Sequence, residues 1–181
     1  MQHVIELCFL LKLNLCNGFK GNAMLKVETA MATAIEEAKK AFAAGEVPIG
    51  AALFHKKSGR LIAVGHNKTK ALNDPTWHAE MEVIKKACQS LETTYLNDYV
   101  LFTTVEPCAM CATACAHAKV GEIYFGAYDV KSGGTINGAR IFNQQTCHHK
   151  PEVYGGIMEG ICQGLIRDFF KEKRGVGAVP S

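Results

Sequence analysis

The chain has 181 residues, of which 48% are hydrophobic and 20% charged, and its formal net charge is +3. This length suffices for one domain with a substantial core, and the composition is ordinary for a soluble globular protein. Its eight cysteines do not indicate a small secreted disulfide scaffold, because such scaffolds are shorter and denser in cysteine. We therefore expect a reducing compartment, the cytoplasm. The mildly basic charge permits a polyanionic partner without requiring one.

The chain begins with an apolar stretch, VIELCFLLKLNLC. Glu6 and Lys12 interrupt it, no basic segment precedes it and no small-residue cleavage site follows it, which is unlike a secretory signal peptide. The stretch is also too short to span a bilayer. We therefore predict that residues 1–23 form an extension that the fold does not need, and that residues 24–181 form the domain. A weak targeting segment is the alternative.

Apolar residues then recur at helical spacing from 27 to 44, and Gly45 is a natural end for this helix. Two strands of a hairpin follow at 47–55 and 60–67. The remaining elements are predicted as helix 78–91, strand 98–105, helix 108–118, strand 120–128, polar loop 129–145, short strand 152–157 and closing helix 159–174. Strands that alternate with helices predict a single α/β domain in which helices cover a sheet.

The closing helix has one apolar side in this interpretation. Ile161, Leu165 and Phe169 share the helical spacing of an amphipathic segment, so we expect them to face the core. Its last residues, KEKR, are basic; such a run is usually a solvated helix face.

Two short motifs, TWHAE and VEPCAMC, contain the side chains that we expect to carry out chemistry. Cys108 and Cys111 are one helical turn apart, so their sulfurs can converge on one point. At a helix amino terminus, free N–H groups and the helix dipole favour the thiolate that a metal requires. With His78 as a third donor, a zinc ion keeps its fourth position for water, as in catalytic sites. Glu80 is not needed as a ligand and is placed to transfer protons.

Other interpretations of these residues stay open at this point. Cys108 and Cys111 alone could form a redox pair, although the nearby histidine and glutamate favour a metal. Cys115, His117 or His148 could supply a fourth ligand and close the site. We expect Cys115 to belong to the core, His117 to end its helix, and the polar His148–His149 pair to contact phosphate or a base.

The order and spacing of several longer motifs resemble the bacterial tRNA-specific adenosine deaminases, a branch of the zinc-dependent nucleobase deaminases. The motifs are EVPIGAAL, GHNKTKALNDPTWHAE, VEPCAMCATACAHAKVGEIYFGAYDVKSGG and DFFKEKR. The resemblance extends from Val27 to Arg174. It implies a cytidine-deaminase-like three-layer α/β/α sandwich with a mixed five-stranded sheet. It also implies a homodimer that acts on the tRNA anticodon stem-loop and does not enter a membrane.

The implied reaction is hydrolytic deamination of adenosine to inosine at the wobble position (34) by a zinc-bound hydroxide. Carried over residue by residue, the family pattern assigns the zinc ion, one per subunit, to His78, Cys108 and Cys111. It assigns proton transfer to Glu80.

The same pattern assigns contacts with the RNA. Asn67 is expected to hydrogen-bond the base, Asp129 to accept from a ribose hydroxyl, and Lys131 to contact phosphate. Tyr128 departs from the arginine that some members carry there and could offer a stacking face. Trp77 is bulkier than the small residue usual at its position, and its role stays open. The basic end of the closing helix approaches the RNA stem in this family.

Two other functions compete with this one. A deaminase of a free base or nucleoside, of the guanine or cytosine type, would share the NDPTWHAE loop. Against it stand FGAYDVKSGG and the basic, aromatic tail, for which a small-molecule enzyme has no need. A non-catalytic, zinc-stabilised RNA-binding domain would have no use for Glu80 beside the metal. The sequence does not identify the tRNA isoacceptor.

Overall fold

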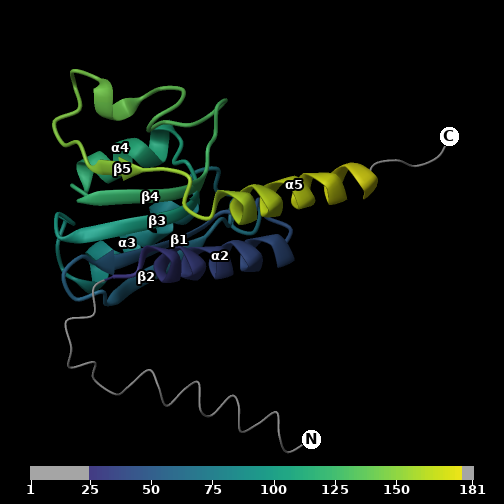
Figure 1. Cartoon of the computed structure of the whole chain (residues 1–181), viewed down its shortest axis with the longest axis horizontal. Helices are drawn as coiled ribbons and strands as arrows, with labels where there is room; N and C mark the ends of the chain where they lie inside the picture. Colours follow the sequence, from purple (N-terminus) through teal and green to yellow (C-terminus); the bar gives the residue numbers. More distant parts are fainter. Residues whose placement is uncertain (1–24, 177–181) are drawn as a thin grey trace, which may run out of the picture.

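A mixed sheet of five strands forms the centre of the structure, a computed structural model that describes residues 25–176 (Figure 1). The strand order is β2-β1-β3-β4-β5; β1 pairs antiparallel with β2 and β3, whereas β3, β4 and β5 run parallel. The strands are β1 (Gly50–His55), β2 (Leu61–His66), β3 (Tyr99–Val105), β4 (Glu122–Ala127) and β5 (Glu152–Tyr154).

Helices cover both faces of this sheet. One face packs against α2 (Val27–Ala43) and α5 (Glu159–Val176), which lie side by side in Figure 1. The other face packs against α3 (Ala79–Ser90) and α4 (Ala109–His117), with the short helix η1 (Ile141–Asn143) beside α4. The predicted three-layer α/β/α sandwich with a mixed five-stranded sheet is thus confirmed.

The central strand β3 explains why the two helix layers hold together. Successive side chains of a strand point to opposite faces, and almost all of β3 is buried. Leu101 belongs to the core beneath α3 and α4, whereas Val100 and Phe102 belong to the core beneath α2 and α5. This strand leads directly into the turn that begins α4, so the core fixes where α4 starts.

The predicted elements all occur in the order expected, but one predicted core residue is wrong. Ile161 is 51% exposed, whereas its neighbour Cys162 is 1% exposed and Phe169 is 3% exposed. The cause is a close approach of α5 to β4 at Gly126, where an added Cβ would lie 2.3 Å from the Cys162 sulfur. Cys162 therefore enters the core and Ile161 turns outward.

The extension predicted for residues 1–23 lies outside the described residues, so its dispensability stays a prediction. Within the described part of the chain, no helix has both the length and the apolar character that a membrane crossing requires.

Gly50 offers a test of the contact between α2 and the sheet. A Cβ at Gly50 would lie 2.1 Å from the Ala34 carbonyl oxygen and 2.3 Å from the Ala38 amide nitrogen, both in the backbone of α2. Backbone cannot move aside as a side chain can, so we expect Gly50→Ala to destabilise the protein by about 3 kcal/mol. For a chain of this size the thermal midpoint, followed by circular dichroism, would fall by about 10 °C.

Gly160→Ala is the matched control, because an added Cβ there has no atom within 4 Å. Alanine favours the helix more than glycine does, so the midpoint should be unchanged or slightly higher. Equal midpoints for the two variants would show that α2 does not lie this close to β1.

Candidate metal centre

His78 and Cys108 occupy equivalent positions, each the residue directly before a helix. His78 precedes α3 and Cys108 precedes α4, both with extended backbone, and neither side chain forms a capping hydrogen bond. Side chains at this position ordinarily cap the helix. Here both are free to turn toward each other across the layer of α3 and α4.

Three donor atoms meet at this point. The His78 Nδ1 atom lies 3.7 Å from the Cys108 sulfur and 3.5 Å from the Cys111 sulfur, and all three donors lie within 4.8 Å of one another. A tetrahedral zinc ion, with bonds of about 2.3 Å to sulfur and about 2.0 Å to nitrogen, would separate these atoms by about 3.6 Å. The donor set therefore fits zinc in both chemistry and spacing.

The protonation of the two sulfurs reflects their closeness. The Cys111 side chain beside it, and then His78, lower the pKa of Cys108 to about 4. The same contact, followed by burial, raises the pKa of Cys111. Hydrogen bonding to Cys108 raises the pKa of His78. A divalent cation among these groups would favour the thiolate at both cysteines and the neutral imidazole.

Glu80 lies beside the three donors without belonging to their cluster. It is 3% exposed, and its carboxylate accepts from the Cys111 thiol at 3.6 Å and from the Thr103 hydroxyl at 3.4 Å. Burial raises the pKa of this carboxyl group. The arrangement offers a proton-carrying group next to the position that an ion would occupy.

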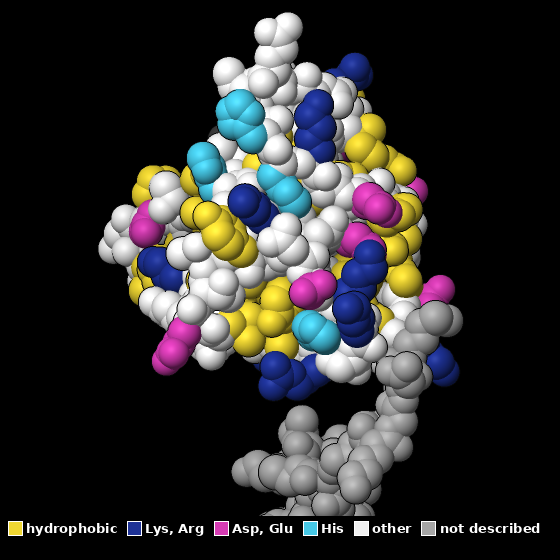
Figure 2. Space-filling model, turned by 90° about the vertical axis from the view of Figure 1, so that its left-hand side faces the viewer, with side chains coloured by type: hydrophobic (Ala, Val, Ile, Leu, Met, Phe, Trp, Pro, Cys, Tyr) yellow, Lys and Arg dark blue, Asp and Glu magenta, His cyan; other side chains and the backbone are white. Residues whose placement is uncertain are grey.

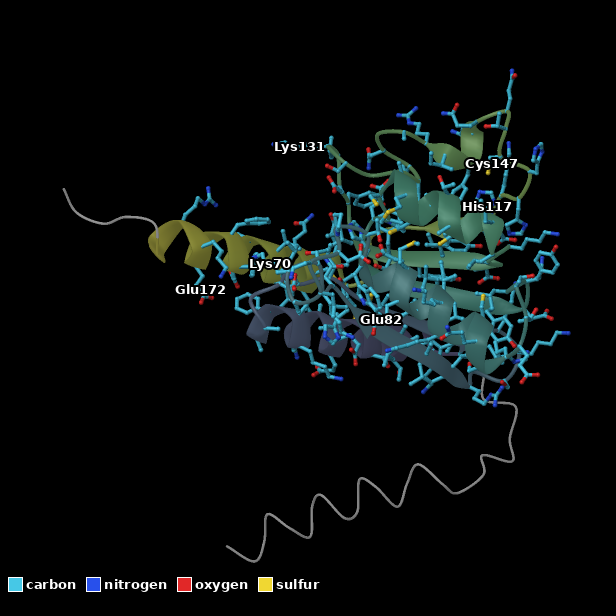
Figure 3. The ribbon with its side chains drawn as sticks, turned by 180° about the vertical axis from the view of Figure 1, so that it is seen from behind. Lys70, Glu82, His117, Lys131, Cys147 and Glu172 are labelled. Carbon is cyan, nitrogen blue, oxygen red and sulfur yellow. The ribbon has the colours of Figure 1, made fainter. Side chains whose placement is uncertain are left out.

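The residues considered as a fourth ligand lie elsewhere. Cys115 is fully buried in the core. Among the described residues, the cluster with the spacing of metal ligands consists of His78, Cys108 and Cys111. His117, His148 and His149 instead line a cavity of 440 Å³. Histidine side chains gather on this side of the molecule (Figure 2), and Figure 3 shows His117 and Cys147 away from Lys131. None of these four residues would therefore supply a fourth ligand to an ion bound by His78, Cys108 and Cys111.

Asn67 is fixed relative to the cluster through the first residue of α3. It is 4% exposed, and its side-chain oxygen accepts from the Ala79 amide at 3.0 Å. This bond supplies α3 with the cap that His78 does not provide. With the oxygen engaged, the amide nitrogen of Asn67 is left to donate, and no hydrogen bond from it to another described residue is found.

Glu106 holds the loop that carries Asp129 and Lys131, a role that the sequence analysis did not identify. Its buried carboxylate accepts from five donors in this loop: the backbone amides of Asp129, Ile136 and Asn137, the Thr135 hydroxyl and the Asn137 side-chain amide. Burial alone would raise the pKa of Glu106, but the donors, Asn137 foremost, outweigh it and the pKa is lowered. The carboxylate is therefore charged at neutral pH and keeps all five bonds.

The loop also touches the backbone beside the three-donor cluster. The Gly134 amide donates to the Pro107 carbonyl at 2.7 Å, and Gly133 forms an isolated bridge with Cys108. An added Cβ at Gly134 would lie 2.5 Å from the Ala109 amide nitrogen. The structure thus brings the Asp129 loop against the start of α4. The sequence feature that could have indicated this role of Glu106 is its position, directly after a buried strand and directly before the Pro-Cys pair.

Asp129 and Lys131 differ in how firmly they are held. One Asp129 carboxylate oxygen accepts from the backbone amides of Lys131 and Ser132, which leaves the other oxygen without such a bond. The Lys131 side chain is exposed and points outward from the loop (Figure 3). Both residues are therefore accessible to a ligand that covers the site.

Trp77 lies along the outer side of α3, where the Lys85 ammonium is 5.1 Å from its ring centroid. It belongs to neither core cluster. Its indole nitrogen is buried without a hydrogen-bond partner among residues 25–176. The half-buried Trp77 ring therefore packs on the outside of α3. This packing accounts for its position, whereas its role in function stays open.

Comparison with known families identifies the same region. The model of the cytidine and deoxycytidylate deaminase zinc-binding region matches residues 24–127. The tRNA-specific adenosine deaminase of Agrobacterium fabrum is 46% identical over 144 residues, which cover 80% of this chain and 93% of that protein. Residues 24–127, the region that the family model matches, contain His78, Glu80, Cys108 and Cys111.

Solved structures agree with this similarity. A structure from a study of A-to-I editing by tRNA:A34 deaminases at the wobble position has 44% sequence identity and a TM-score of 0.73, covering 76% of this chain and 98% of that chain. Guanine deaminase from Bacillus subtilis has 37% identity and a TM-score of 0.52, covering 56% of this chain and 64% of that chain. The tRNA deaminase is thus similar over more of the chain.

The three-donor cluster predicts the metal content of single variants. After dialysis against a weak chelator, the unmodified protein should retain about one zinc ion per chain by elemental analysis. His78→Ala should lose most of this zinc, because only two of the three donors remain.

His117→Ala is the matched control, since His117 lies on α4 but lines the separate cavity. It should retain zinc like the unmodified protein. Full zinc content in His78→Ala, or equal loss in both variants, would contradict the assignment of His78 to the cluster.

Proposed function

The chain belongs to the cytidine and deoxycytidylate deaminase family, and we propose that it deaminates adenosine to inosine at the wobble position of tRNA anticodons. The observation that carries this proposal is a zinc-type donor set of His78, Cys108 and Cys111 with the carboxylate of Glu80 beside it. Its similarity to tRNA-specific adenosine deaminases over 80% of the chain supports the choice of substrate.

We assign the zinc ion to His78, Cys108 and Cys111. Zinc with three protein ligands supplies an activated water molecule, because it lowers the pKa of water toward about 7. The protein's own residues must then orient the base and move the protons of the reaction. The sum of the reaction is adenosine plus water to inosine plus ammonia.

Glu80 is the group that we propose moves these protons. It takes a proton from the attacking water, delivers one to N1 of the adenine ring and then passes one to the departing amine. Its burial and its distance of 3.6 Å from the Cys111 sulfur support this role. The Thr103 hydroxyl, 3.4 Å from the other carboxylate oxygen, holds the carboxylate in this position.

Asn67 is proposed to orient the base. Because the Ala79 amide engages its side-chain oxygen, the nitrogen can donate to an acceptor on the purine. Ala79 is next to His78, so this donor keeps a fixed relation to the metal ligands. The carbon that loses its amine is then held near the activated water.

Asp129 and Lys131 are proposed to contact the RNA outside the base pocket. The free Asp129 carboxylate oxygen can accept from a ribose 2′-hydroxyl, which distinguishes RNA from DNA. Lys131 is exposed and suited to a phosphate. A deaminase of free guanine or cytosine would need neither contact, and for this reason the RNA substrate is favoured.

Two further features of the family are retained as proposals. The homodimer implied by the resemblance would let a second copy complete the RNA surface. A cytoplasmic location is supported by the described cysteines, all of which are free thiols.

Turnover of tRNA provides the test of the proposed function. The zinc-loaded protein, incubated with tRNA, should convert the wobble adenosine to inosine, which sequencing reads as an A-to-G change. Glu80→Gln should lose activity by about 1,000-fold or more while retaining zinc, because glutamine cannot carry the protons. His78→Ala should lose both activity and zinc.

Full activity in Glu80→Gln would remove the proton-transfer role. Turnover of free guanine or cytidine, with none on anticodon RNA, would replace the proposed substrate with the alternative one.

Glu106→Gln should weaken substrate binding more than it slows the chemical step. The change replaces one acceptor oxygen with an NH₂ group that faces N–H donors, so the Asp129 loop loses its attachment. We expect the KM for an anticodon stem-loop to rise about tenfold or more, with a smaller fall in kcat and with zinc retained.

Glu122→Gln is the control for a general effect of removing a buried charge. Glu122 is 9% exposed and pairs with Lys56 at the opposite end of β4 from the Asp129 loop. Its KM should stay near that of the unmodified protein. Equal KM values for both variants would show that Glu106 does not position the RNA-binding loop.

A further inference from the structure

A groove of 530 Å³ lies between the loop that Glu106 holds and the start of β5. In Figure 1 this loop rises beyond β5, at the edge of the molecule opposite β2. The residues of the groove that matter here are Ile136, Arg140, Phe142, Lys150, Pro151 and Val153. None of them belongs to the metal cluster, and the proposed function does not use this groove.

The groove carries two positive charges without compensation. Arg140 and Lys150 are exposed, and neither forms an ion pair with another described residue. No carboxylate of the described residues lines the groove. By contrast, Lys56 and Lys86 pair with buried glutamates. An anion that entered the groove would therefore meet two cations and no opposing charge.

The floor of the groove is apolar. Phe142 and Pro151 are buried there, Val153 is half-buried, and Ile136 leaves 43% of its surface exposed at one side. Cations above an apolar floor match a nucleotide, whose phosphate is charged and whose base and sugar present apolar faces. An inorganic anion would make no use of the floor.

The wall of the groove is fixed relative to the metal centre. The Ile136 amide donates to Glu106 at 2.8 Å, and the Ile141 amide donates to the Gly134 carbonyl at 2.7 Å. Arg140, between them, has a left-handed backbone with φ of 44°, a conformation that non-glycine residues rarely adopt and that needs support from its surroundings. The same loop carries Asp129, whereas Lys150 and Pro151 directly precede β5, whose first residue pairs with Glu122 at the start of β4. The groove therefore extends from the loop that carries Asp129 toward that end of the sheet.

We propose that this groove binds one nucleotide of the substrate RNA outside the catalytic pocket, with its phosphate between Arg140 and Lys150. The inference rests on the proposed RNA substrate and adds a second contact region to it. Phosphate contacts of this kind set the register of the strand rather than read its sequence. The groove would thus hold the anticodon loop while the target base occupies the pocket near Glu80.

Equilibrium binding tests the groove without requiring turnover. The Kd of a fluorescently labelled anticodon stem-loop would be measured by anisotropy with the full zinc-loaded chain over a range of salt concentrations. The double variant Arg140→Ala/Lys150→Ala should bind about tenfold more weakly or worse. The slope of log Kd against log salt should fall by about 0.7, since the double variant loses one phosphate contact and each such contact of a single strand contributes about 0.7.

Lys57→Ala is the matched control. Lys57 is exposed on the turn between β1 and β2, at the other edge of the sheet, and forms no ion pair with a described residue. It should change Kd by less than about twofold. A double variant that behaves like Lys57→Ala would overturn the proposal.

A scan with neutral methylphosphonate linkages identifies the contact itself. Replacing one particular phosphate of the stem-loop should weaken binding to the unmodified protein but not to the double variant, because the two changes remove the same interaction. Losses that simply add at every linkage would overturn the proposal. A change in sedimentation of the double variant, with RNA affinity retained, would identify the groove as a contact between copies of the chain instead.

The outcomes separate this inference from the proposed function. Absence of inosine formation by a protein that binds the stem-loop through Arg140 and Lys150 would defeat the proposed reaction but support the groove. Normal inosine formation, with Kd and kcat unchanged in the double variant, would support the reaction and defeat the groove. Failure of the unmodified protein to bind the stem-loop would defeat both.

Discussion

The constraint on which the site depends is the meeting of two helix amino termini, those of α3 and α4, on one face of the sheet. His78 and Cys108 directly precede these helices. Their side chains point toward each other instead of capping the helices. Asn67 supplies the hydrogen bond that α3 would otherwise lack. Because the buried strand β3 leads into α4, the packing of the core determines the separation of the metal donors.

Buried carboxylates then fix the loops around that point. Glu46 accepts from the backbone amides of Lys70 and Ala71, Glu82 accepts from the Lys68 ammonium, and Glu106 accepts from the loop of Asp129. A buried charge is costly unless several donors satisfy it. Each carboxylate therefore favours one loop conformation over others, and the loops that surround the metal centre gain an order that their polar sequences do not provide alone.

The parts of this arrangement that sequence could reveal are those encoded by short-range patterns. The spacing of Cys108 and Cys111, the order of helices and strands, and the turn before His78 are local features, and the structure contains each of them. Glu106 and Ile161 are different. The partners of Glu106 lie 23 to 31 residues away, and the exposure of Ile161 follows from the closeness of Cys162 to Gly126. Periodicity within one segment carries no information about either.

The similarity to a guanine deaminase structure indicates which residues determine substrate specificity. Members of one fold that act on different bases share the metal donors and the proton-carrying carboxylate, so these groups cannot select between them. Selection falls to the residues that meet the rest of the substrate. In this chain the loop from Asp129 to Arg140 is attached to Glu106, two residues before the first metal-binding cysteine. In the function that we propose, this loop contacts the RNA, so the same carboxylate would link recognition of the nucleic acid to the position of the chemistry.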